Sequence, residues 1–122
     1  MTFKEVLNQA KSLGLCSEEV VILQSTAGSS CYYVDCIIVS PSQAKKVANL
    51  LSLSFVEVLW AIFLHELGHA CDQEFIREDE LQILLEEVVA WDYAQELLPL
   101  SPLEEGAFQK VRSWALATFV NA

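Results

Sequence analysis

The sequence predicts one α+β domain that spans residues 1–122, with a short β-sheet beside a buried central helix. Helix start signals recur along the chain, and two segments in its first third are rich in β-branched and aromatic residues. No repeat, low-complexity stretch or linker divides the chain. A length of 122 residues, 53% of them hydrophobic, suits a single domain with a modest core.

Five segments carry the signals of helix ends. Most begin at a capping box, in which Ser or Thr is followed three residues later by Glu or Gln, and Asp79 leads a related pair. Pro41 and Pro102 occupy expected first helical positions, and Gly14 is placed to end the first helix. The expected helices cover residues 3–13, 41–51, 55–72, 80–98 and 102–119, with capping pairs Thr2/Glu5, Ser40/Gln43, Ser54/Glu57, Asp79/Gln82 and Ser101/Glu104.

Two strands are predicted between the first and second helices. Residues 19–25 and 31–39 have the composition of strands, and residues 26–30 have the length of a hairpin turn. We therefore expect these two strands to pair with each other.

The charge balance excludes some partners. With 17 acidic residues against 7 Lys and Arg, the net charge is -10, so we expect no nucleic-acid partner and no docking on an anionic membrane. The first residues lack the apolar segment of a signal peptide, and the most apolar stretch, residues 50–64, is too short to span a bilayer. We therefore expect a cytoplasmic protein. In that compartment the four cysteines, which form no CxxC pair, are expected to be reduced.

The segment His65-Glu66-Leu67-Gly68-His69 carries the chemistry. It contains both histidines of the chain, which lie one helical turn apart on one face and can bind a single zinc ion. Glu66, about 100° round the helix, can reach a metal-bound water rather than the metal. Chance is the alternative, but the helix is apolar nearly all round, and two buried imidazoles need partners. Gly68 costs about 1 kcal/mol relative to Ala inside a helix, so we expect backbone or substrate close to it.

The third ligand must be Asp, Glu or Cys, because the chain has no other histidine. On a helical wheel of residues 80–98, Glu87 lies near the middle of the apolar face, whereas Glu86, Asp92 and Glu96 lie on or near the polar arc. No Lys or Arg on this helix can pair with a core-facing acid. Glu87 is therefore favoured over Glu86 as the third ligand.

Together, HELGH and the segment of residues 87–94 (EVVAWDYA) resemble the gluzincin metallopeptidases, whose third ligand is a Glu on a downstream helix. The short chain and close spacing are similar to the minigluzincins, and residues 90–99 also resemble the ImmA/IrrE family. The resemblance covers residues 61–99 and implies a zincin-like domain. Strand 31–39 would then offer its edge to substrate, as an alternative to serving only as core sheet.

The resemblance also implies the roles of the site residues. His65, His69 and Glu87 would bind Zn²⁺, and Glu66 would be the general base of a zinc-dependent peptidase that hydrolyses peptide bonds in a peptide or protein substrate. The alternative is a catalytically silent or regulatory metal-binding protein, similar to the ImmA/IrrE family, that acts through a specific protein partner.

The sequence departs from the gluzincin pattern in two ways. Trp91 stands four residues after Glu87, where gluzincins often have an Asp that orients a ligand histidine, and Asp72 is only a weak substitute. No histidine follows His69 to stabilise the oxyanion, and a packing or surface role is favoured for each remaining candidate, namely Tyr32, Tyr33, Tyr93 and Arg112. The last helix would cover the core, with a role in latency as the alternative.

Overall fold

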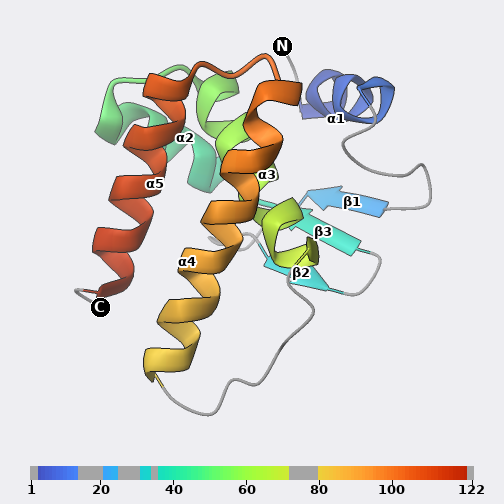
Figure 1. Cartoon of the computed structure of the whole chain (residues 1–122). Coiled ribbons are helices and arrows are strands. Elements are labelled where there is room, and N and C mark those ends of the chain that lie inside the picture. Colours follow the sequence, from blue (N-terminus) through green and yellow to red (C-terminus); the bar gives the residue numbers. More distant parts are fainter. Residues whose placement is uncertain (1–2, 14–20, 25–30, 34–35, 72–79, 121–122) are drawn as a thin grey trace.

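The computed structural model describes residues 3–13, 21–24, 31–33, 36–71 and 80–120 (Figure 1). Its elements are α1 (Phe3–Ser12), β1 (Val21–Gln24), β2 (Cys31–Tyr33), β3 (Cys36–Val39), α2 (Pro41–Leu51), α3 (Phe55–Cys71), α4 (Glu80–Leu97), a 3-10 turn η1 (Leu98–Leu100) and α5 (Glu105–Val120).

Helix α3 is the centre of the molecule. It contacts α1, α2, α4 and α5, and it also contacts β2 and β3. Residues 58–64 of α3 are all buried, with Trp60 only 1% exposed, which agrees with a helix that is apolar nearly all round. The most extensive of these contacts is with α4, which runs along α3 in Figure 1.

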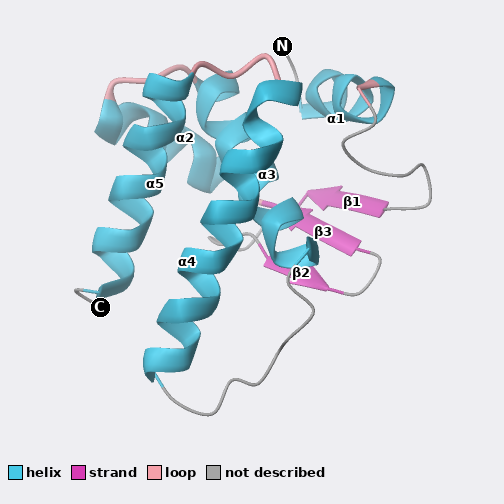
Figure 2. Cartoon of the chain, viewed as in Figure 1, coloured by secondary structure: helices cyan, strands magenta, loops and turns pink. Residues whose placement is uncertain are grey.

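The predicted α+β class, and the zincin-like sheet domain implied with it, is wrong. Among the residues whose side chains the structure describes, 87% are helical. The strands contain only three or four residues each, and they lie together at one side of the helices, away from α5 (Figure 2). Of the strand side chains that are described, Val39 contributes to the core. The long apolar helices bury the core, because such short strands offer too little surface to form one of its layers.

The predicted hairpin between residues 19–25 and 31–39 is also wrong. The segment 31–39 forms two strands that pair antiparallel with each other, and β1 pairs in parallel with β3. The order is therefore β1-β3-β2, with β3 in the middle. All four residues of β3 are apolar, which suits a central strand, and this uninterrupted apolar run looked like part of one longer strand in the sequence.

Two predicted helix starts are confirmed by their hydrogen bonds. Ser54 and Glu57 form a reciprocal capping box at the start of α3, with both backbone N–H groups donating over 3.1 Å to the partner's side chain. At the start of α2, the backbone N–H of Gln43 donates to Ser40 Oγ. The capping positions Thr2 and Asp79 lie outside the described residues, as does Gly14.

The predicted start of the last helix is wrong. The hydroxyl of Ser101 donates to the carbonyl of Leu98 and accepts from the N–H of Leu103, so it closes a local turn instead of capping a helix. Helix α5 begins at Glu105, three residues after Pro102. Within the described ranges, no single helix is long and apolar enough to cross a membrane, and α2 with α3 pass that test only as a pair bent by 118°.

Gly68 lets α3 and α4 approach closely. A methyl group at this position would overlap the backbone carbonyl of Ala90, whose Cα would lie 3.2 Å away. The neighbour predicted for this glycine is therefore the backbone of α4. A close approach of this kind requires a residue without Cβ, and it holds the two helices in one register.

We predict that Gly68→Ala lowers the free energy of unfolding by at least about 2 kcal/mol, because the new methyl group forces α4 away from α3. Gly106→Ala is the matched control, since a Cβ there meets nothing within 4 Å. That control should be stabilised by about 0.5 kcal/mol through better helix propensity. Urea unfolding of both variants measures the difference, and equal stability of Gly68→Ala and wild type would contradict the proposed contact.

Candidate metal centre

Helix α3 brings the two histidines together. His65 and His69 are separated by one turn, and their Nε2 atoms lie 3.2 Å apart. Both rings are mostly buried, with side-chain exposures of 13% for His65 and 7% for His69. Two imidazole nitrogens that face each other at this distance can bind the same metal ion.

Helix α4 supplies a carboxylate to the same point. The Oε2 atom of Glu87 lies 2.9 Å from His65 Nε2, and its Oε1 atom lies 3.2 Å from His69 Nε2. We refer to His65, His69 and Glu87 together as the candidate metal centre. Each residue offers one ligand atom, and these three atoms lie within 4.8 Å of one another. The structure thus brings together the three residues that the sequence singled out as ligands.

The donor set fits a tetrahedral zinc ion. Zinc binds imidazole nitrogen and carboxylate oxygen at about 2.0–2.2 Å, so neighbouring ligand atoms in a tetrahedral site lie roughly 3.3 Å apart. The separations in the candidate metal centre, 2.9 and 3.2 Å from Glu87 and 3.2 Å between the two histidines, are close to that spacing. Two histidines and a carboxylate also leave the fourth position of such a site for water.

The protonation states suit metal binding. Burial lowers the pKa of His65 below 6.5, against the opposing hydrogen bond and charge of Glu87, so its imidazole is neutral at pH 7. Burial alone would raise the pKa of Glu87, but the hydrogen bonds and charges of His65 and His69 outweigh it and lower that pKa to about 2. A neutral imidazole and an ionised carboxylate are the forms that bind a metal ion.

Two further acids beside the candidate metal centre are buried. Glu66, the predicted general base, follows His65 on α3 and is 3% exposed. Glu86 is 7% exposed, so its assignment to a solvated polar arc is wrong. A helical wheel assumes one buried face, whereas α4 packs against both α3 and α5 and buries more of its circumference.

Trp91 is a residue of this site to which the sequence analysis gave no role. Its ring stacks on His65 with centroids 4.3 Å apart and an angle of 17° between the planes. Trp91 lies one turn after Glu87, so the same face of α4 provides a carboxylate and an aromatic ring to α3. That i, i+4 spacing is the signal that could have identified it.

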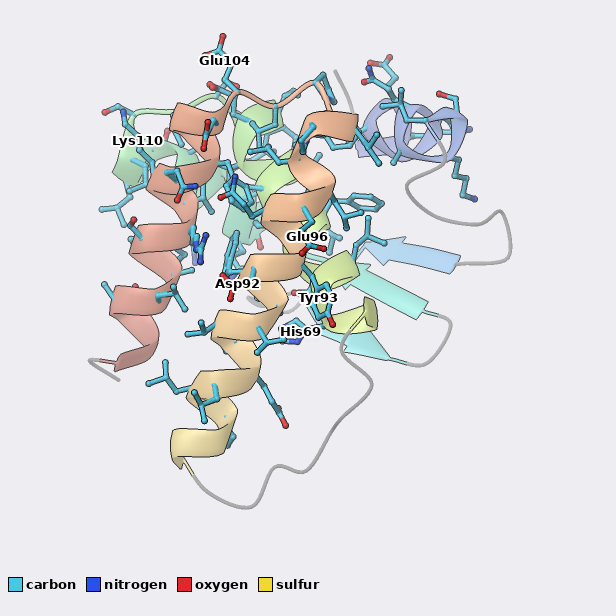
Figure 3. The ribbon with its side chains drawn as sticks, viewed as in Figure 1. His69, Asp92, Tyr93, Glu96, Glu104 and Lys110 are labelled. Atoms are coloured by element: carbon cyan, nitrogen blue, oxygen red, sulfur yellow. The ribbon has the colours of Figure 1, made fainter. Side chains whose placement is uncertain are left out.

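The other sequence candidates are placed in different surroundings. Arg112 pairs with Asp92 over 2.6 Å and so links α5 to α4. Figure 3 shows Asp92 and Tyr93 leaving α4 on different sides, Asp92 toward α5 and Tyr93 toward the side on which His69 lies. Asp72 is outside the described residues, and the side chains of Tyr32 and Tyr33 are not among those described.

Comparisons with protein-family profiles, curated proteins and solved structures gave no match to this chain.

We predict that Glu87 makes the metal-free protein sensitive to acid. Its pKa in the folded protein is lowered from 4.5 to about 2, so the stability that its carboxylate contributes is complete above about pH 4.5 and is lost as the pH falls toward 2. In the presence of a chelator, wild type should lose more unfolding free energy between pH 5 and pH 3 than Glu87→Gln does. Urea titrations at each pH measure this loss.

Glu96→Gln is the control for this measurement, because it removes an exposed carboxylate from the same helix. It should retain the acid sensitivity of wild type. An equally steep loss of stability in Glu87→Gln and wild type would contradict the assigned interaction of Glu87 with the two imidazoles.

Proposed function

We propose that this protein is a zinc-dependent peptidase with a gluzincin-type site. The observation that carries the proposal is the convergence of His65 Nε2, His69 Nε2 and the Glu87 carboxylate at the spacing of a tetrahedral zinc site. The HExxH segment and the downstream glutamate support it. In HExxH the residue after the first ligand histidine is Glu66, whose carboxylate is suited to proton transfer. We also propose, from the resemblance of residues 61–99, that the chain is related to the minigluzincins or to the ImmA/IrrE family.

The proposed division of labour follows from the positions of the residues. His65, His69 and Glu87 would hold Zn²⁺, which when bound lowers the pKa of a coordinated water toward neutrality. Glu66 is next to His65 and about 100° round the helix from it, which supports a role in accepting a proton rather than in binding the metal. It would take the proton of the attacking water and deliver it to the nitrogen of the leaving amine.

The proposed substrate is a peptide or a protein segment. Strand β2 is at the edge of the sheet and contacts α3, so an extended segment could add beside it through backbone hydrogen bonds. The net charge of -10 favours neutral or basic segments over acidic ones and disfavours nucleic acid as a ligand. We also propose that the protein acts in the cytoplasm and away from membranes.

A second candidate is a regulatory or silent metal-binding protein that acts through one protein partner. The hydrogen bonds between the imidazoles and Glu87 favour it, because they complete the group without a substrate. The position of Glu66 favours the peptidase instead, because it is buried next to a ligand histidine, where a general base would meet a metal-bound water.

We predict that purified protein binds one equivalent of Zn²⁺ and that Glu66→Gln keeps the metal while peptide cleavage falls by at least about 100-fold, because the general base is removed. Glu87→Ala should lose most of the bound zinc, since two imidazoles alone hold it weakly. Metal analysis and cleavage of a mixed library of fluorogenic peptides measure both effects.

Glu86→Gln is the matched control, because it changes the neighbouring buried acid and tests the alternative third ligand. It should retain zinc at the wild-type level. Full zinc occupancy in Glu87→Ala would overturn the ligand assignment. Cleavage that persists in Glu66→Gln would overturn the mechanism, and tight zinc binding by wild type without any cleavage would favour the regulatory protein.

A further inference from the structure

His65 is held by a ring and not by a hydrogen bond at its second nitrogen. A metal-binding histidine usually donates its other ring N–H to a carboxylate or a carbonyl, and this bond sets the direction of the ring. Among the residues that the structure describes, the buried Nδ1 of His65 has no hydrogen-bond partner. Trp91, in contrast, lies nearly parallel to the imidazole over 4.3 Å.

A flat neighbour restrains the torsion that matters. The χ2 torsion of histidine has a broad, roughly two-fold profile, so the side chain alone does not direct Nε2 toward a metal. Rotation of the His65 ring about this torsion would drive its edge into the face of Trp91, because the two planes differ by only 17°. The ring of His69 also meets His65, at 4.5 Å and 68°. The stack therefore fixes the plane of the ring, and the 2.9 Å contact with Glu87 Oε2 favours the flip of the ring in which Nε2 faces Glu87.

Trp91 is itself held in place. It is 2% exposed, and the ring of Phe108 from α5 meets it at 5.6 Å and 64°. The same two helices are joined outside the core by the ion pair between Arg112 and Asp92. An aromatic pair in this edge-to-face arrangement favours one geometry over others. Helix α5 thus contributes to the candidate metal centre through Trp91, although it supplies no ligand atom to it.

We propose that Trp91 is a positioning residue for metal binding, which fixes His65 by stacking in the role that a hydrogen-bonded carboxylate plays elsewhere. This inference rests on the proposed function. Metal binding draws electron density from the imidazole, and an electron-poor ring is attracted to the face of indole. The stack therefore stabilises the metal-bound form of His65 more than the free form, besides orienting the ring.

The test compares zinc affinities in variants of the full chain. Trp91→Met fills most of the volume without a flat ring, Trp91→Phe retains a ring, and Trp60→Met is the control, since Trp60 is equally buried on α3 and packs against Phe63. Affinities come from competition with a chromophoric chelator, and urea unfolding reports stability. We expect zinc binding to weaken at least about tenfold in Trp91→Met, as for other groups that orient ligands. Trp91→Phe should stay within about threefold of wild type, and Trp60→Met within about twofold.

A second readout needs no metal. In wild type treated with a chelator, the ring current of Trp91 should shift the carbon-bound ring protons of His65 upfield in the NMR spectrum, and the shift should disappear in Trp91→Met but not in Trp60→Met. Wild-type zinc affinity in Trp91→Met, or equal weakening in Trp91→Met and Trp60→Met, would overturn this inference and leave the zinc site standing. Failure of wild type to bind zinc would overturn both, even with the ring-current shift present.

Discussion

The contact between Gly68 and the backbone of Ala90 sets the distance between α3 and α4, and the rest of the structure depends on it. The candidate metal centre is divided between these two helices, with two imidazoles on one and a carboxylate on the other. Its ligand atoms are about 3 Å apart, and the close backbone approach at Gly68 holds the two helices near each other beside them. Gly68 precedes the ligand His69 by one residue, so this close approach of the helices lies next to the candidate metal centre.

The interface of α3 and α4 serves as core and as site at once. On α4, Glu87, Trp91 and Ala94 follow at three- and four-residue intervals, so one face provides a carboxylate, an aromatic ring and a small buried residue in turn. On α3, the buried residues 58–64 lead directly into the histidines. A chain of 122 residues has a small core, and here the two imidazoles and Glu87 are paired with one another across the interface.

The sequence was sufficient for the parts of this protein that depend on local signals. The starts of α2 and α3 followed from capping residues. The convergence of Glu87 with the histidines followed from helical periodicity and from the need of a core-facing acid for a partner. A close neighbour at Gly68, either backbone or substrate, was expected from the cost of glycine in a buried helix, and it is the backbone of α4.

Features that depend on tertiary contacts were not predicted. The order of the strands in the sheet depends on which strands pair, and a local preference for extended backbone does not determine that pairing. Glu86 is buried because α4 has more than one neighbour, which a wheel of a single helix does not represent. The later start of α5 reflects competition for the hydroxyl of Ser101 within a turn. Trp91 gained its role only when its partner on α3 was known.

X-ray absorption at the zinc edge of the zinc-loaded full chain tests the proposed metal site without reference to activity, because it reports the ligand atoms themselves. We expect a four-coordinate site with nitrogen and oxygen ligands at about 2.0–2.1 Å, including the multiple-scattering pattern of two imidazoles. The chain also contains four cysteines, so a competing site is chemically available. A sulfur shell at about 2.3 Å, or a spectrum with fewer than two imidazoles, would contradict the assignment of His65, His69 and Glu87 as the metal ligands.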